Sequence, residues 1–316
     1  MDKTTNKEKI SYKFIIKEII VYVLLGIWAL IVLLPFYWMI MTSFKTNASY
    51  NAEMTPQFIP LSPTFDNYAI AWTAVPLARY MLNTVVFSIT TTFLMIIVSI
   101  LAAFAFARLE FKGKNLLFTI FLSMMMIPNE LIILTNYVTI TNAGLRDTFT
   151  GLILPSVLSI FYIYLLRQNF MQVPDATYYA AKVDGLSDRQ YLMKVLIPLS
   201  KPTIVSKIII KLIECWNSYV WPRLITRTDS NSLVSLGIET IRSTLGGGQP
   251  NYPAMMAAVV CVSLPLLIIF LIFRRQIMSG VLRTGTKGWF YEIKKSIIRI
   301  INVCWNCSFS FLPWNL

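Results

Sequence analysis

Long apolar runs with few or no charged residues dominate the chain. Six of them come close to the length of about 20 residues that crosses a bilayer as a helix. None alternates between apolar and polar positions as the strands of a membrane barrel do. The runs cover residues 19–44, 80–107, 115–137, 148–166, 202–224 and 253–273. The third holds Glu130, and the weaker fifth holds Lys207, Lys211 and Glu214. Because a helix satisfies its own backbone in lipid, the pattern predicts an all-α integral membrane protein with six transmembrane helices.

Composition supports the membrane class and excludes most catalysis. The 316 residues are 56% hydrophobic and only 14% charged, where a soluble domain carries about 25% charge. The chain has no histidine, which removes the commonest general base and metal ligand. Cys304 and Cys307 form a lone C-x-x-C pair, which is a weak signal for metal or redox chemistry. We therefore expect no catalytic residue and no metal site.

Basic residues predict the orientation. The net charge of +13 first suggests nucleic acid or anionic lipid as a partner. With the N-terminus in the cytoplasm, 20 of the 28 basic residues but only eight of the 15 acidic residues fall inside. This asymmetry is the positive-inside signal of membrane proteins, and it predicts that both termini are cytoplasmic. Most of the net charge is therefore explained by the orientation in the membrane. The expected partner is membrane lipid, and nucleic acid is not expected.

The expected organisation follows from the runs and the orientation. The first run of 26 uncharged residues exceeds the core of about 7–15 residues in a signal peptide, so it predicts a retained anchor. The expected segments are a cytoplasmic N-terminus at 1–18, a first helix at 19–44, an outer loop at 45–79, a core of spans at 80–276 and a cytoplasmic tail at 277–316.

A polar stretch between the fourth and fifth runs is long enough to fold. Asp175 is a suitable N-cap for a helix over 176–183. Gly185 suits the left-handed conformation that ends helices. Ser187 and Gln190 have the spacing of a capping box, which predicts a second helix after the glycine.

Motifs in this stretch resemble the "EAA" loop of binding-protein-dependent ABC importer permeases. They are Val173-Pro174, Ala180-Ala181, Asp184-Gly185 and Ile197-Pro198-Leu199. Motifs in the flanking runs extend the resemblance, among them Phe104–Arg108, Met125–Pro128, Leu165–Gln168, Trp216–Pro222 and Met256–Ala258. The resemblance covers about residues 15–288 and points to the shorter six-span subunit of the maltose, raffinose and glycerol-3-phosphate group. The tail after Gly288 departs from the family, and we assign it no role.

The resemblance implies a type I ABC importer transmembrane domain in a bacterial cell membrane, importing a sugar or a sugar or polyol phosphate. Residues 173–200, called the coupling segment below, are expected to dock on a cytoplasmic ATPase dimer. The implied docking residues are Asp175, Tyr179, Ala180, Ala181, Asp184 and Gly185. Tyr179 stands where the family has a glutamate, which leaves that glutamate's contact in doubt.

Other partners also follow from the resemblance: a second permease subunit, forming a heterodimer, and an extracellular or periplasmic solute-binding protein. The chain lacks a Gly-x-x-x-x-Gly-Lys-Ser/Thr phosphate loop. ATP and Mg are therefore expected on the partner ATPase, with no cofactor bound by this chain.

Polar residues within the expected spans are candidates for a substrate path, since ionisable groups at membrane depth are usually functional. The candidates are Asn129, Glu130, Lys211, Glu214, Trp216, Asn217 and Tyr219. Lys211 and Glu214 lie at helical spacing, so a structural pair that faces the partner subunit is the alternative.

Two other classes of protein compete with the importer subunit. An ion-coupled secondary transporter would use Glu130, Lys211 and Glu214 as a relay, but such folds usually show internal repeats. A membrane enzyme would need histidine or clustered carboxylates on one aqueous face. We therefore expect a transport subunit without its own chemistry.

Overall fold

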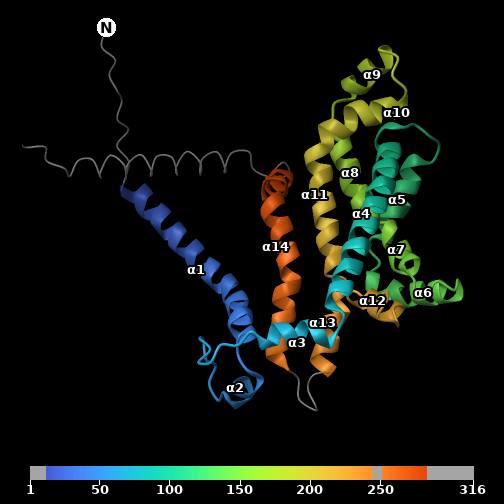
Figure 1. Ribbon diagram of the computed structural model, residues 1–316. Coiled ribbons are helices and arrows are strands. Elements are labelled where there is room, and N and C mark those ends of the chain that lie inside the picture. Colours follow the sequence, from blue (N-terminus) through green and yellow to red (C-terminus); the bar gives the residue numbers. More distant parts are fainter. Residues whose placement is uncertain (1–11, 245–250, 283–316) are drawn as a thin grey trace, which may run out of the picture. The chain divides into compact units, whose positions relative to one another are not determined.

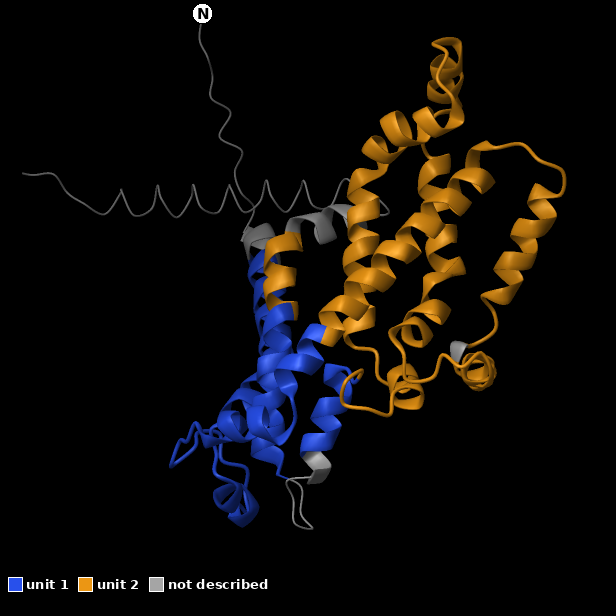
Figure 2. Cartoon of the chain, turned by 45° about the vertical axis from the view of Figure 1, so that its right-hand side comes forward, with its two compact units in different colours: residues 1–82, 232–265 blue, residues 83–231, 266–316 orange. Residues whose placement is uncertain are grey.

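The computed structural model describes residues 12–244 and 251–282 (Figure 1). These residues form two compact units (Figure 2). Of the described residues, unit 1 comprises 12–82, 232–244 and 251–265, and unit 2 comprises 83–231 and 266–282. Every regular element in the described part is a helix, which confirms the all-α class. The tail after residue 282, with Cys304 and Cys307, lies outside the described residues.

Within residues 12–244 and 251–282, three helices are each long and apolar enough to cross a membrane. They are α1 (Tyr12–Ser43), α4 (Leu77–Arg108) and α14 (Tyr252–Leu282), with apolar parts at Glu18–Ser43, Leu77–Arg108 and Tyr252–Arg274. The most apolar 18 residues of α1 include no buried residue, so this hydrophobic surface is left for lipid or another chain. These helices match the first, second and last expected runs.

The third expected run is two helices instead of one. α5 (Lys114–Met124) ends at a short break, and α6 (Asn129–Asn142) begins after Pro128. Proline has no N–H, and it disfavours helical backbone at the residue before it. The break at Pro128 therefore interrupts the helix that the apolar run over 115–137 predicts.

The fourth expected run is also broken. α7 (Phe149–Val157) and α8 (Ile160–Met171) meet at an angle of 43°. Thr148 caps α7 by accepting a hydrogen bond from the backbone N–H of Gly151, which fixes where the run begins. The pair extends beyond the expected end at residue 166, and together the two helices can form a fourth span.

The fifth run begins earlier than the sequence predicts. α10 (Asp188–Tyr191), the π-helical turn η1 (Leu192–Leu196) and α11 (Ile197–Trp216) follow one another without a break. In the π-turn the N–H of Ile197 bonds to the carbonyl of Leu192, five residues back, just before Pro198. The proline therefore does not separate the coupling segment from the span, and the short α12 (Val220–Ile225) follows α11.

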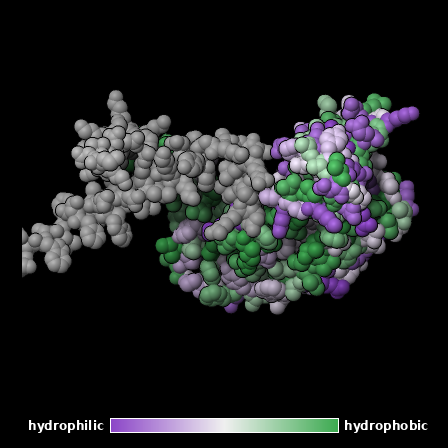
Figure 3. Space-filling view, turned by 90° about the horizontal axis from the view of Figure 1, so that it is seen from above, coloured by the Kyte–Doolittle hydropathy of each residue, from purple (hydrophilic) through white to green (hydrophobic). Residues whose placement is uncertain are grey.

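Short helices complete both units. Unit 1 holds α2 (Asn47–Ala52), α3 (Asp66–Ala74) and α13 (Val234–Thr244), and α9 (Asp175–Val183) belongs to unit 2. In unit 2, a buried apolar cluster joins α4, α8, α9, α10, η1 and α11. Figure 3, which views the end that carries α9 and α10, shows hydrophilic side chains gathered there and hydrophobic ones on the surrounding helices. The helices of this cluster position the coupling segment.

Candidate coupling and substrate-path sites

The coupling segment begins with α9, which starts one residue earlier than expected. Pro174 occupies the N-cap position and Asp175 is the first helical residue, so the prediction of Asp175 as the N-cap is wrong. Proline suits this place because the first helical turn leaves its N–H groups without intrahelical partners. The carboxylate of Asp175 still lies at the positive end of the helix dipole.

A Schellman motif ends α9, as Gly185 predicts. The N–H of Gly185 donates to the carbonyl of Lys182 at 3.0 Å, and the N–H of Leu186 donates to the carbonyl of Ala181 at 2.9 Å. Gly185 has φ +79°, a left-handed conformation that residues with a side chain adopt at a cost. Leu186 packs against the buried cluster of unit 2, which directs the chain back to that cluster after the turn.

Hydrogen bonds staple α9 to the helix that follows the turn. Ser187 and Gln190 form the expected capping box, with bonds of 2.9 and 3.3 Å. Asp188 accepts hydrogen bonds from the Tyr178 hydroxyl at 2.7 Å and the Lys182 ammonium at 2.8 Å. Lys182 and then Tyr178 lower the pKa of Asp188, whereas burial and the bond to Asp188 raise the pKa of Tyr178 to about 12.

The six predicted docking residues face different ways. Ala181 is buried in the chain's own apolar cluster at 5% exposure, so its small side chain permits close packing within this chain. Ala180, Asp184 and Gly185 are exposed, and Tyr179 is 66% exposed. Val183, which the sequence did not single out, is 87% exposed. α9 thus presents an apolar and aromatic face away from its own chain.

Arg108, the last residue of α4, connects this helix to the start of the coupling segment. Its guanidinium donates to the carbonyl of Phe170 at 2.7 Å and to the carbonyl of Val173, and it pairs with Asp175. The Arg108 side chain is 4% exposed, whereas that of Asp175 is 79% exposed. Arginine's five donors in a planar fork allow one side chain to bind all three acceptors.

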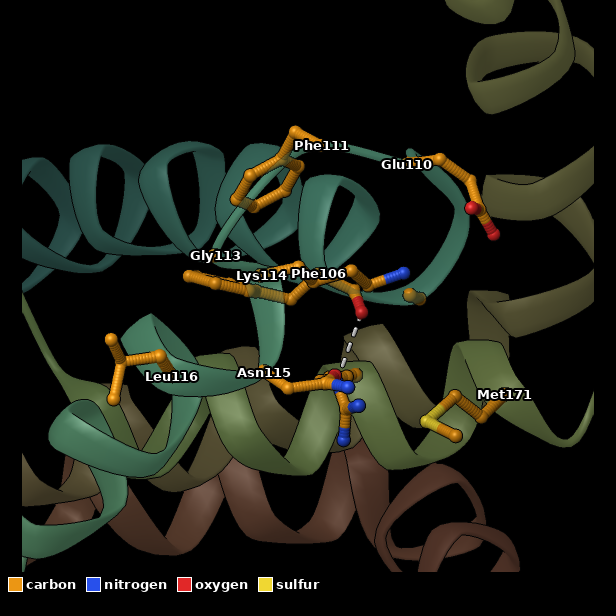
Figure 4. Close-up of a pocket in the computed structure, with 10 residues that line it drawn as sticks. Phe106, Glu110, Phe111, Gly113, Lys114, Asn115, Leu116 and Met171 are labelled. Carbon is orange, nitrogen blue, oxygen red and sulfur yellow. Dashed lines mark hydrogen bonds between the residues drawn. The ribbon is translucent and has the colours of Figure 1, made fainter.

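Arg167 makes a reciprocal connection from α8 to α4. Its Nε donates to the carbonyl of Phe106 at 3.1 Å, the bond drawn in Figure 4, and its guanidinium stacks on the Phe118 ring at 3.9 Å. A cavity of about 410 Å³ adjoins this bond. It is lined by Phe106, Ala107, Glu110, Phe111, Gly113, Lys114, Asn115, Leu116, Arg167 and Met171.

The expected pair of Lys211 and Glu214 is present on α11. Lys211 Nζ lies 2.8 Å from Glu214 Oε1, and the Tyr162 hydroxyl donates to Glu214 Oε2 at 3.1 Å. The Lys211 side chain is 6% exposed, whereas that of Glu214 is 57% exposed. The carboxylate thus reaches the surface of this chain while its cationic partner is buried.

The remaining path candidates do not all join this pair. Trp216 is buried at 5% exposure, whereas Asn217 and Tyr219, at the end of α11, are exposed. Asn129 begins α6, and Glu130, one residue on, is exposed. Among the described residues, no hydrogen bond or ion pair links Glu130 to Lys211 or Glu214. Only the residues near the end of α11 form a local group.

Groups that hold metal ions are not found among the residues that the structure describes. There, no three His, Cys, Asp or Glu side chains lie close enough together to bind one ion.

Comparison with known proteins identifies the family. The pattern of the binding-protein-dependent transport system inner membrane component matches residues 95–283, more than half of the chain. The chain belongs to this family. The permease is also 31% identical over 270 residues to the sn-glycerol-3-phosphate transport system permease protein UgpE of Yersinia pestis, covering 83% of this chain and 95% of the relative.

Other relatives agree. The permease is 27% identical over 266 residues to the arabinooligosaccharides transport system permease protein AraQ of Bacillus subtilis, covering 82% of this chain and 92% of the relative. A solved bacterial ABC transporter involved in the import of the acidic polysaccharide alginate contains a chain with the same fold. The TM-score is 0.74 at 22% identity, covering 85% of this permease and 99% of that chain.

The family assignment confirms the resemblance found in the sequence. The permease is an integral membrane transport subunit rather than an enzyme, as the sequence predicts. Family membership also decides against the ion-coupled secondary transporter. The residues that match the family include both α9 and α11.

Sequence reasoning missed the roles of Arg108 and Arg167. Each ends an apolar run, and the positive-inside rule alone accounts for a basic residue there. Their bonds to backbone carbonyls connect residues 61 or more apart in the chain. An arginine directly after the second and after the fourth apolar run is the local signal that could have suggested the contact.

Proposed function

We propose that the permease is a subunit of an ATP-driven importer that moves a sugar, or a sugar or polyol phosphate, across the bacterial cell membrane. The observation that carries the proposal is the coupling segment: a stapled pair of helices with Tyr179 and Val183 exposed on α9. Such a surface suits docking because apolar and aromatic side chains dominate the cores of protein interfaces.

A separate ATPase dimer binds ATP and Mg and docks on α9. The first turn of α9 is tied to α4 through Arg108, and α10 continues into α11 without a break. Closure of the ATPase dimer would therefore displace the coupling segment and the spans together. Asp175, Tyr179, Ala180, Asp184 and Gly185 form or border the docking surface, and Ala181 supports it from within.

The permease crosses the membrane six times, with both termini in the cytoplasm. α1, α4 and α14 supply three spans, the bent pair α7–α8 a fourth and α11 a fifth. The third run, which is α5 and α6 with the break at Pro128 between them, supplies the remaining one. The positive-inside bias supports this topology, which places the coupling segment in the cytoplasm and residues 45–79 outside. The segment boundaries at 18, 44, 79 and 276 follow from the same reasoning.

The solute passes along a path between this permease and a second, different permease subunit. Glu214, Asn217 and Tyr219 are surface groups near the end of α11 that can face that path. An aromatic ring, an amide and a carboxylate are all suitable contacts for sugar hydroxyls. Relatives named for arabinooligosaccharide and glycerol-3-phosphate transport support the solute class.

A solute-binding protein delivers the solute to the outer loops. The family description supports this partner, and so does a solved neighbour of the same fold, an alginate ABC transporter in complex with a pentasaccharide-bound periplasmic protein.

Uptake in cells tests the proposal. A panel of labelled mono- and oligosaccharides and glycerol-3-phosphate is offered to cells that express the complete importer. A matched strain carries the ATPase with its phosphate-loop lysine replaced by alanine. We expect uptake of at least one solute in the first strain and none in the second. Equal uptake in both strains would contradict ATP-driven import.

A further inference from the structure

An uncharged, apolar segment follows α2 in unit 1. Residues 54–65 contain no Asp, Glu, Lys or Arg. Five large apolar side chains in this segment are at least 60% exposed: Met54, Phe58, Ile59, Leu61 and Phe65. Side chains of this kind seldom gather on a surface that faces only water, so the segment has a partner of some kind.

The segment is held in place at both ends. The ammonium of Lys45, which is 1% exposed, pairs with Glu53 at 2.8 Å and donates to the carbonyl of Gln57 at 2.7 Å. At the other end, the N–H of Thr64 donates to the carbonyl of Phe44 at 2.8 Å. These contacts fix the backbone at both ends of the segment, and that backbone holds the apolar side chains at the surface. Lys45, the cation that binds this segment, is itself buried and paired with Glu53.

Contacts with α1 place the segment beside the end of a membrane span. The Tyr37 hydroxyl donates to the carbonyl of Phe58 at 2.9 Å, and the rings of Trp38 and Phe58 meet edge to face at 5.8 Å. Trp38 precedes the end of α1 at Ser43 by five residues, which is about 8 Å along a helix axis. Phe58 therefore lies alongside the apolar part of α1, and Figure 1 shows the chain after α2 returning toward this end of the helix.

We propose that residues 54–61 lie in the interfacial layer of the bilayer, with their apolar side chains in contact with phospholipid. Their surface continues the exposed apolar surface of α1, which surrounds that helix and is too extensive for one partner helix to cover. Tyr37 and Trp38 are residue types that gather at the level of the headgroups. An irregular backbone does not enter the hydrocarbon core, so the segment stays in the interface.

The inference deepens the proposed topology, in which this is the outer interface. It goes beyond the predicted outer loop at 45–79 by placing residues 54–61 at the membrane surface rather than in water. Site-directed spin labelling of the complete importer in phospholipid nanodiscs distinguishes the two. Cys215, Cys261, Cys304 and Cys307 are replaced by serine, and the variant is checked for assembly. Single cysteines are then introduced as I59C or L61C, with N51C and L30C as controls.

Collision with oxygen, which partitions into lipid, is compared with collision with a water-soluble nickel complex. Asn51 is an exposed polar residue on α2, and Leu30 is a 70% exposed residue within α1. We expect labels at 59 and 61 to show a severalfold higher oxygen-to-nickel ratio than the label at 51.

Three other results would overturn the proposal. A ratio at 59 and 61 equal to that at 51 would place the segment in water. Exclusion of both reagents from 59 and 61 would mean that a protein partner covers it. A water-like ratio at 30 would overturn the membrane placement of α1 as well, and with it the proposed topology. If the ratio is lipid-like at 30 but water-like at 59 and 61, this inference fails while the proposed topology stands.

Discussion

Arg108 binds three acceptors at the root of the coupling segment. One is the backbone carbonyl of Phe170 in α8, the second is the backbone carbonyl of Val173 just after that helix, and the third is the carboxylate of Asp175. Asp175 is mostly exposed, and an exposed ion pair contributes only about 0–1 kcal/mol. A buried carbonyl left without a partner costs about 1–3 kcal/mol, so the carbonyls should matter more than the carboxylate.

The first prediction separates these roles. Arg108→Ala should strongly reduce solute-stimulated ATP hydrolysis by the importer, because the coupling segment loses its attachment to α4. Asp175→Asn should have a small effect, since both carbonyl contacts remain. Both variants are measured at equal amounts of assembled complex. Equal loss in the two variants would assign the role to the ion pair instead.

The second prediction concerns the turn at Gly185. A Cβ at this position meets no atom within 4 Å, so substitution acts through the backbone alone. Gly185→Val should destabilise the turn by about 1–2 kcal/mol, the cost of left-handed backbone for an L-residue. Uptake should fall while the amount of permease in the membrane stays unchanged.

Gly185→Asn is the matched control, because asparagine visits the left-handed region more readily. Uptake by the asparagine variant should lie between those of the wild type and the valine variant. If Gly185→Val takes up solute as fast as the wild type, the turn has no role in coupling.

The third prediction rests on the unequal burial of Lys211 and Glu214. Removing Glu214 leaves the buried ammonium of Lys211 without its counter-charge, which is destabilising because a buried charge needs a partner. Removing Lys211 leaves a carboxylate that is 57% exposed and still bonded to Tyr162. Glu214→Met should therefore lower the melting temperature of the solubilised complex more than Lys211→Met. The opposite order would contradict the orientation of this pair.

At the scale of elements, the coupling segment is a helix–turn–helix stapled by one carboxylate. Asp188 connects the two sides of the turn through Tyr178 and Lys182. The buried cluster beneath, which includes Ala181, Tyr191 and Leu196, supports both helices. The exposed face of α9 can therefore transmit force as a unit.

The fourth prediction tests this staple by hydrogen exchange. Asp188→Asn should speed amide exchange in α9 and the turn, while exchange in α4 stays unchanged. The lowered pKa of Asp188 sets the pH dependence: the ordinary value is 3.8, and the staple is complete above it. Its contribution is lost only as the pH falls through the lowered pKa. Exchange in wild-type α9, corrected for its intrinsic rate, should therefore not differ between pH 6 and 8, and acceleration within that range would contradict the assignment.

Local signals in the sequence predicted this element well. Gly185 and the Ser187–Gln190 capping box act within a few residues, so their geometry follows from residue type and spacing. The break in the fourth run was less accessible, because apolar residues continue on both sides of it. The contacts of Arg108 depend on packing between distant segments, which no local pattern contains.

At the scale of the whole molecule, the chain divides its tasks among segments. In the proposed function, the exposed apolar helices provide the membrane surface, α11 carries the candidate groups for the solute, and α9 offers a docking surface to the ATPase. Sequence patterns predicted the fold class and the family. The faces of α9 required the structure, since Ala180 and Ala181 are identical residues that point to different surroundings.

The central claim is that the exposed face of α9 binds the ATPase. The most direct test places a photo-reactive benzoylphenylalanine at Val183 in the assembled importer, with Leu116 as the control. Both positions are exposed, at 87% and 66%, but only Val183 lies on α9. We predict that irradiation crosslinks position 183, but not 116, to the ATPase chain. An intact complex in which position 183 forms no crosslink to the ATPase would contradict the account.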